Sequence, residues 1–299
     1  MIAQMPHIQD NEDLVAIIQA MRLQEETGYQ TSDYLYPLEQ QQQQEQQGPK
    51  KPCHIDADCR FKMAEWCYQI VDYCSFSREA VAIAMSCLDR FLCTPAGSKA
   101  IGNRKAFRLA AMACLYTAIK VHEAEAVDPE TFVELSRNCY KEEQITSMEA
   151  TVLGAIEWRV NPPTALAFVQ HFLAMIPSLT NKERKSLLKL SRFQTELAVN
   201  ESSFLGVKAS TIAIAAIANA LRASAKDQKI VDMLATITET DMETDFMKEI
   251  QMTLFELLEC VSEENPSEEK TPEPVTTMKQ VAENGDEGHV SPRCVSESR

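Results

Sequence analysis

Apolar residues recur at helical spacing along most of the chain, so the pattern predicts helices almost throughout. A short amphipathic helix is predicted at 11–27, where Leu14, Ile17, Ile18 and Met21 share one face. From Asp56 onward, the same periodicity predicts helices at about 56–74, 77–94, 103–124, 128–138 and 141–157. Ser77 is expected to cap the second of these, and Asp128 with Pro129 to begin the fourth.

The run Asn161-Pro162-Pro163 interrupts the helical pattern, because proline lacks the backbone donor that a continuing helix needs. Helices then follow at about 164–176, 181–200, 208–224, 227–236 and 241–260. Five helices, a break and five more helices indicate two consecutive helical units, although the two halves do not visibly match in sequence. We therefore expect an all-α protein with a domain boundary at residue 161.

The flanking segments differ in composition from these units. Gln40 to Gln44 form an unbroken polar run before Pro49 and Pro52, and the chain beyond Cys260 is rich in Pro, Glu, Ser and Thr. Both segments are expected to be disordered, since they have little apolar surface to bury. The predicted divisions are an N-terminal helix and linker at 1–52, helical units at 53–161 and 162–260, and an acidic tail at 261–299.

Charge and composition exclude several classes of function. The 299-residue chain has a net charge of −15, with −6 in residues 1–50 and −5 in residues 262–299. This net charge argues against a nucleic-acid binder, which needs a basic face, and no apolar run reaches membrane-spanning length. The ten cysteines lie mostly among apolar residues, without C-x-x-C spacing, and nothing near Met1 resembles a secretory signal. We expect reduced thiols, no structural metal and a nuclear and cytoplasmic protein.

Catalytic signatures are missing from the sequence. It contains no phosphate-binding glycine loop, no H-E-x-x-H and no G-x-S-x-G, and its five histidines are scattered. We therefore expect a non-catalytic protein without a cofactor.

Charged residues inside otherwise apolar helices are more informative. Asp89 and Arg90 interrupt AIAMSCLDRFL, Lys120 follows LAAMACLYTAI, and Glu149 follows Met148. An ionised group in an apolar setting is costly unless it is paired. Each of these residues therefore needs a salt-bridge partner within the chain or a charged group on a partner protein.

Four short motifs, in order over about 100 residues, resemble the cyclin box. They are Arg60-x4-Glu65-Trp66, Leu88-Asp89-Arg90-Phe91-Leu92, Lys120-x2-Glu123 and Met148-Glu149-x3-Leu153. LDRFL and NPPTALAFVQHFLAMIP look most similar to D-type cyclins. The resemblance implies two consecutive five-helix cyclin folds.

The resemblance also implies a function and the residues that carry it. The chain would bind and activate a cyclin-dependent kinase as a heterodimer and so control cell-cycle progression, in G1 or at G1/S. Lys120 and Glu149 would form the polar centre of the kinase interface, and Arg60 would pair with Asp89 as a structural salt bridge. The residues expected around the polar centre are Val121, Glu123, Leu153 and Trp158.

Departures from the family pattern bear on substrates and regulation. A docking patch on the first helix would be built on Met63 and Trp66, but Lys62 stands where the family has an apolar residue. Thr271 and Ser291 each precede a proline and are candidate phosphosites in a tail that resembles a degradation signal. Kinase inhibitors and the ubiquitin machinery are further expected partners.

Two other classes of function compete with this interpretation. A cyclin-fold transcription factor that contacts DNA or polymerase would need zinc-ribbon cysteines and a basic face, and the sequence has neither. A helical scaffold or an unrecognised enzyme would need a polar pocket that the sequence does not reveal.

Overall fold

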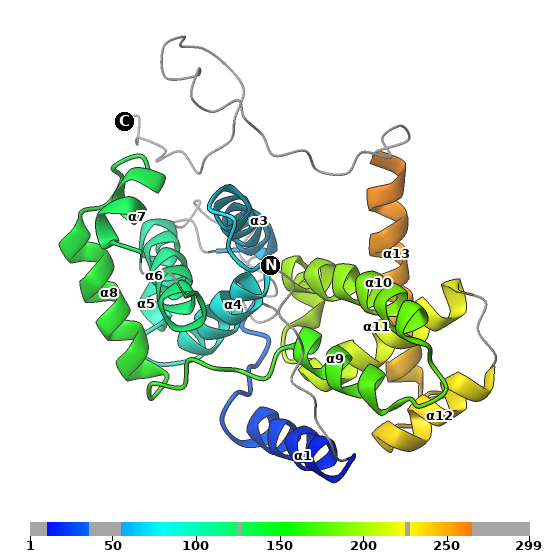
Figure 1. The fold of residues 1–299 in the computed structure, drawn as a ribbon. Coiled ribbons are helices and arrows are strands. Elements are labelled where there is room, and N and C mark those ends of the chain that lie inside the picture. The colour runs from blue at the N-terminus through cyan, green and yellow to red at the C-terminus, as the bar shows by residue number, and fades with distance from the viewer. Residues whose placement is uncertain (1–10, 36–54, 125–126, 225–227, 265–299) are drawn as a thin grey trace, which may run out of the picture.

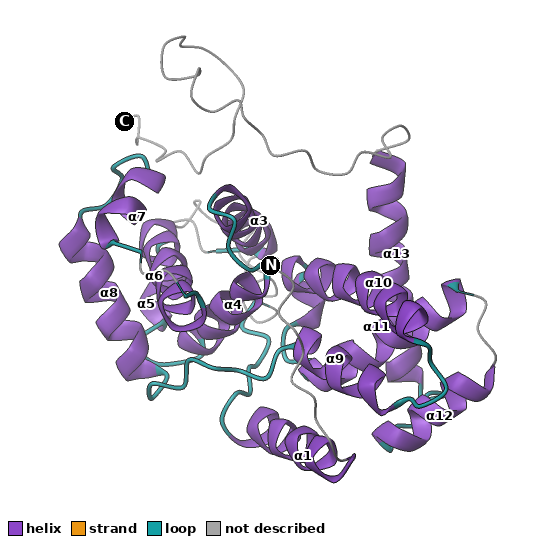
Figure 2. Ribbon diagram, viewed as in Figure 1, coloured by secondary structure: helices purple, strands orange, loops and turns teal. Residues whose placement is uncertain are grey.

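The computed structural model describes residues 11–35, 55–124, 127–224 and 228–264. Within these ranges it contains helices and connecting segments only (Figure 2). The helices form two groups side by side, with α1 (Asn11–Thr27) beneath both in this view (Figure 1). The all-α fold class expected from the sequence is confirmed.

The first group surrounds one central helix, α6 (Arg104–His122), which contacts every other helix of the group. The others are α3 (Ala57–Tyr73), α4 (Glu79–Leu92), α5 (Ser98–Ile101), α7 (Pro129–Leu135) and α8 (Glu142–Ala155). The middle of α6 is buried on all sides, and Phe91, Phe107 and Phe132 pack fully inside. Burying one such ring contributes roughly 1.5–3 kcal/mol, so this group has a substantial core of its own.

The second group also surrounds one helix, α11 (Ala209–Ala223). Around it lie α9 (Ala165–Met175), α10 (Asn181–Asn200), α12 (Gln228–Thr238) and α13 (Asp245–Glu264), with a 3-10 turn, η1 (Ser202–Phe204). The buried stretch Ile212–Leu221 is rich in alanine, which lets neighbouring helices approach closely. Phe168 and Phe172 of α9 fill the adjoining space and are fully buried.

Side-chain caps explain why the helices begin where they do. Asp56 accepts the Cys59 N–H at 2.8 Å, Asn103 caps α6 in the same way, and Thr180 forms a capping box with Glu183. Asp128 and Pro129 begin α7, as predicted. The prediction for Ser77 was one residue off: Arg78 occupies the N-cap of α4, and the Ser77 hydroxyl accepts the Glu79 N–H at 3.3 Å.

Three further details differ from the sequence prediction. α5 and η1 were not predicted, because a single turn is too short to show periodicity. Gly97 caps α5, and a Cβ there would lie 2.0 Å from the Phe91 carbonyl oxygen, so no larger residue fits. α13 continues to Glu264, so residues 261–264 are helical, whereas a disordered tail was expected to begin at 261. The rest of that tail and residues 36–54 of the linker lie outside the described residues.

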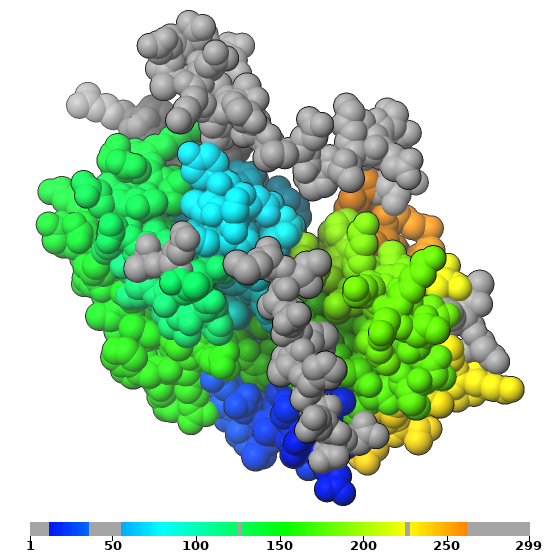
Figure 3. Space-filling model, in the orientation of Figure 1, coloured from blue at the N-terminus to red at the C-terminus, as the bar shows by residue number. Residues whose placement is uncertain are grey.

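The N-terminal segment spans both groups. Leu14 and Ile18 of α1 pack into the core of the second group, whereas Tyr34 and Leu35 pack into the core of the first. Ile17, expected on the same buried face, is 37% exposed. Figure 3 shows α1, in blue, at the lower edge of the molecule below the boundary between the groups. Residues 11–35 therefore form a strap across the two halves.

Candidate functional site

An ion pair links the end of α6 to the middle of α8. The Lys120 ammonium lies 2.7 Å from Glu149 Oε1 and 2.9 Å from Oε2, and it stacks over the Tyr116 ring at 4.5 Å. The Thr117 hydroxyl donates to Glu149 Oε1 at 2.9 Å. Two groups, the Lys120 ammonium and the Thr117 hydroxyl, therefore fix the Glu149 carboxylate, and Glu149 is only 7% exposed. The Lys120 side chain is 38% exposed, so its charge reaches the surface.

Apolar side chains extend this polar centre along both helices. Val121 follows Lys120 and is half exposed, and Leu153 lies one turn after Glu149 on the same face of α8. Trp158, just beyond α8, is 72% exposed. An ordered charge pair on α8 and a large, solvent-exposed aromatic ring just beyond its end are typical components of a protein-binding surface.

The backbone holds Trp158 in an unusual conformation. Glu157 and Trp158 have φ angles of 56° and 60°, in the left-handed region that non-glycine residues avoid. The Trp158 N–H donates to the Leu153 carbonyl at 2.9 Å, and the Arg90 guanidinium donates to the Arg159 carbonyl at 2.7 Å. Arg90 of the D-R-F-L motif therefore fixes the turn that presents Trp158. No motif or periodicity in the sequence predicts this turn.

Glu123 has a local role in the structure. It stands at the C-cap of α6, and its Oε1 accepts the Ser77 N–H at 2.9 Å. This contact joins the end of α6 to the start of α4, on the border of the Lys120 surface.

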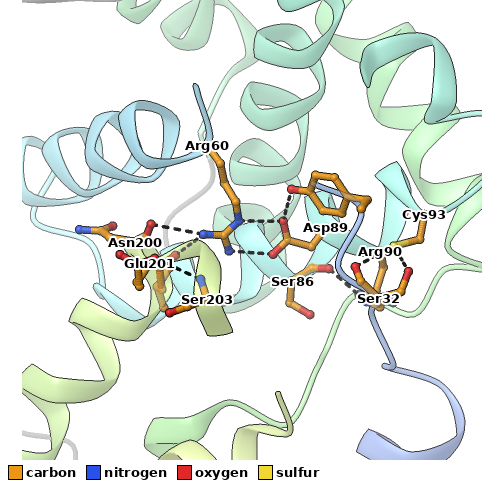
Figure 4. Close-up of polar contacts among 11 residues, drawn as sticks. Ser32, Arg60, Ser86, Asp89, Arg90, Cys93, Asn200, Glu201 and Ser203 are labelled. Carbon is orange, nitrogen blue, oxygen red and sulfur yellow. Dashed lines mark hydrogen bonds and ion pairs between the residues drawn. The ribbon is translucent and has the colours of Figure 1, made fainter. Parts of the chain in front are cut away.

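The second polar cluster is buried between the two halves (Figure 4). Arg60 donates from Nε to Asp89 Oδ1 at 3.1 Å and from Nη2 to Oδ2 at 2.8 Å. Its remaining nitrogen, Nη1, donates to the Val199 carbonyl at 2.8 Å, at the C-terminal end of α10. The Tyr34 hydroxyl donates to Asp89 Oδ1 at 2.8 Å. Arg60 and Asp89 thus join the first half, the second half and the strap.

Electrostatics in this cluster follow from its burial. Burial alone lowers the pKa of Arg60, but the Asp89 carboxylate outweighs that effect, and the net pKa is raised. Burial, together with the nearby Asp89 charge, also raises the pKa of Tyr34 well above its usual value. Arg60 is therefore charged and Tyr34 is protonated at every physiological pH.

The remaining predicted site residues lie elsewhere. Met63 and Trp66 are core residues, 3% and 5% exposed, while Lys62 pairs with Asp58 on the surface at 2.6 Å. Thr271 and Ser291 lie outside the described residues. Among the described residues, no group of His, Cys, Asp and Glu could hold a metal ion, and no helix is long and apolar enough to cross a membrane.

Comparison with known sequences identifies both halves. Residues 14–161 match the family model of the cyclin N-terminal domain, and residues 163–281 match that of the cyclin C-terminal domain. Cyclin-D3-3 of Arabidopsis thaliana is 29% identical over 196 residues, covering 62% of this chain and 51% of that protein. Cyclin-B1-1 of Oryza sativa subsp. japonica is 26% identical over 163 residues, covering 54% of this chain and 35% of that protein.

A solved structure shares the fold. The viral cyclin from herpesvirus saimiri superposes with a TM-score of 0.57 at 15% identity, covering 74% of this chain and 96% of that chain. The chain spans about a third to a half of the length of the curated relatives named above.

Proposed function

Since this chain belongs to the cyclin family, we propose that it is a non-catalytic subunit that binds and activates a cyclin-dependent protein kinase. The observation that carries the proposal is the Lys120–Glu149 pair, held at the surface beside the half-exposed Val121, with the exposed Trp158 just beyond the end of α8. The D-type motifs favour a step in G1 or at G1/S, although A-type and B-type cyclins are similar as well.

The geometry suggests how the pair would act. An ammonium group has three N–H donors, and two of those on Lys120 are used by the Glu149 oxygens. The third has no hydrogen-bond acceptor among the described residues and would donate to a carbonyl or carboxylate on the kinase. Because Thr117 and Lys120 already hold Glu149, the centre is preorganised and little side-chain entropy is lost on binding.

Activation requires the kinase's mobile regulatory helix to sit where its own Lys–Glu pair can form. We propose that the Lys120 centre orients this helix, while Val121 and Trp158 supply exposed apolar contact area. Leu153, expected to share this role, is only 9% exposed and therefore offers little surface to a partner. Glu123, at the border of the surface, would contribute to the rim. Such an arrangement gives orientation from charge and affinity from buried apolar surface.

The test is a double variant, Lys120→Ala with Glu149→Ala. Removing both charges avoids leaving Glu149 buried and unpaired, so unfolding stability should change by only about 1 kcal/mol. Purified wild-type chain should capture a kinase from cell extract and raise its activity, and the double variant should do neither. The kinase would be identified by mass spectrometry.

A matched control removes a comparable pair elsewhere. Lys248 and Glu243 form an exposed ion pair at 2.9 Å near the start of α13. The variant Lys248→Ala with Glu243→Ala should retain full kinase capture. Equal kinase activation by wild type and the Lys120–Glu149 variant would contradict the proposed interface, and recovery of DNA or polymerase in place of a kinase would contradict the function.

A further inference from the structure

The outer face of α10 carries a row of cations. Lys182, Lys185, Lys189 and Arg192 recur at intervals of three and four residues, which places them along one side of the helix. All four are exposed. From first to last they cover about 15 Å, given a rise of about 1.5 Å per residue. Figure 1 shows α10 at the surface of the second half.

These four side chains have no partner within the part of the chain that the structure describes. None of them forms an ion pair or a side-chain hydrogen bond there. Arg184, on the buried side of the same helix, differs: it donates to the Leu173 and Ile176 carbonyls and caps the end of α9. Packing and capping therefore account for Arg184 but not for the outward-facing cations.

The position of the row is unfavourable for the helix itself. The N-terminus of a helix carries a partial positive charge, which favours acidic residues there and disfavours cations. Lys182 and Lys185 lie in the first turns of α10, whereas its last turn has no basic residue. Their charges add to the helix dipole. The capping box of Thr180 and Glu183 already satisfies backbone N–H groups at this end of α10, so an anionic group would be bound by the lysine side chains.

Two large apolar side chains accompany the cations. Leu190 and Phe193 are each 41% exposed, and Phe193 shares the outward side with Lys182 and Lys189. A solvated helix face needs no such residues. Cations flanking exposed Leu and Phe match a ligand that has both carboxylates and apolar side chains.

We propose that the outer face of α10, formed by Lys182, Lys185, Lys189, Arg192, Leu190 and Phe193, docks an acidic protein segment that carries leucine or aromatic residues. The net charge of −15 disfavours a duplex or an anionic membrane, because both would be repelled at long range. A short peptide can meet the local patch without facing the rest of the molecule. This inference does not depend on kinase binding, which is proposed for α6 and α8.

The experiment measures binding of a fluorescent peptide of about 12 residues, enough to span the row of cations as a helix. The peptide carries glutamates at intervals of three and four residues, with leucines on the adjoining side of the helix, and its matched control has glutamine in place of every glutamate. The acidic peptide should bind the full chain, and raising the salt concentration should weaken binding because the contacts are exposed. The glutamine peptide should bind at least about tenfold more weakly.

Variants then locate the site. Lys185→Glu with Lys189→Glu should weaken binding of the acidic peptide at least about tenfold, mainly through a slower association rate. Leu190→Ser with Phe193→Ser should weaken it by raising the dissociation rate. The control Lys99→Glu with Lys105→Glu changes the net charge equally on the other half, where both lysines are exposed, and should bind as wild type does.

Other outcomes would overturn the proposal. If the Lys99–Lys105 control lost as much affinity for the acidic peptide as the α10 variant does, binding would depend only on the net charge of the protein. Tight binding of duplex DNA or anionic vesicles, abolished by the same α10 substitutions, would assign the face to a different ligand. Kinase capture should be unchanged in the α10 variants, which separates this test from that of the proposed function.

Discussion

At the scale of single residues, the buried charges of Arg60 and Asp89 are satisfied by groups from separate segments of the chain. Arg60 was expected to pair with Asp89, and the structure places them in bidentate contact. The Val199 carbonyl and the Tyr34 hydroxyl, which complete the cluster, are contributed by distant segments. No local pattern encodes such long-range contacts, so only the fold reveals them.

Trp158 was expected at the interface because of the resemblance to cyclins, but its backbone could not be predicted. Its φ of 60° is disfavoured for tryptophan, and neighbouring contacts with Leu153 and Arg90 hold it there. Strain of this kind, next to an exposed ring, is consistent with a structure shaped for binding.

This strain leads to a prediction for Trp158→Gly. Glycine adopts positive φ freely, so relief of about 1–2 kcal/mol of strain should offset its greater loss of chain entropy. The ring is largely exposed, so little packing is lost. Trp158→Gly should therefore be more stable to urea than Trp158→Ala, while both bind the proposed kinase at least about tenfold more weakly than wild type. Equal or lower stability of Trp158→Gly would show that the strain in the turn does not exceed the extra chain entropy that glycine loses on folding.

At the scale of elements, the helices that periodicity and caps define were predicted within a few residues. α1 and α10 match their predicted ranges, because each combines an amphipathic pattern with a recognisable boundary. The single-turn elements were missed because they lack periodicity. The side chains that each helix buries were less predictable, since burial depends on which neighbour packs against it.

Glu25 illustrates that limit. It lies on α1 and is 7% exposed, and its carboxylate accepts the Ser210 N–H at 3.0 Å and the Ser210 hydroxyl proton. Glu25 therefore caps the start of α11 from another helix. Burial raises its pKa above the usual value of 4.5, although the Ser210 hydrogen bonds partly oppose this. The adjacent Glu26 is exposed, and its hydrogen bond to Lys208 lowers its pKa.

These two glutamates should affect pH-dependent stability with opposite signs. Just above pH 4.5, folded Glu25 keeps a proton that the unfolded chain releases, so its contribution to stability falls as the pH rises. Below pH 4.5, folded Glu26 is ionised while the unfolded chain binds a proton, so its contribution is lost as the pH falls. The free energy of unfolding should be measured with urea at several pH values. Compared with wild type, it should fall less steeply as the pH rises above 4.5 in Glu25→Gln, and less steeply as the pH falls below 4.5 in Glu26→Gln. Identical pH profiles for both variants and wild type would contradict this assignment.

At the scale of the whole molecule, two helical units are joined by the strap and by contacts at the end of α10. Arg78 of the first half pairs with Glu196 of the second at 2.8 Å, and Thr164 donates to Glu79. Between them, the halves and the strap line an open pocket of about 310 Å³, with the Arg60–Asp89 cluster in its wall. The repeated helical units could be predicted from the rhythm of the sequence. Their mutual position could not, because it depends on buried polar contacts between residues more than 100 positions apart.

Arg60 contacts Asp89 in the first half and the Val199 carbonyl in the second, and Asp89 also binds Tyr34 of the strap. Arg60 should therefore couple the unfolding of the two halves. Wild type is expected to unfold in one calorimetric transition, whereas Arg60→Lys should show two. A lysine keeps the charge beside Asp89, but its single ammonium lacks the planar fork that reaches Asp89 and the Val199 carbonyl together. The first half should then melt earlier, because its buried carboxylate is less well satisfied, while amide hydrogen exchange in α11 stays slow until the second transition.

Arg78→Lys is the matched comparison: its site is 41% exposed, so solvent screens the lost contact and a single transition should remain. Two separated transitions in the wild type would show that the halves unfold independently. The interface would then orient the halves without making their unfolding cooperative.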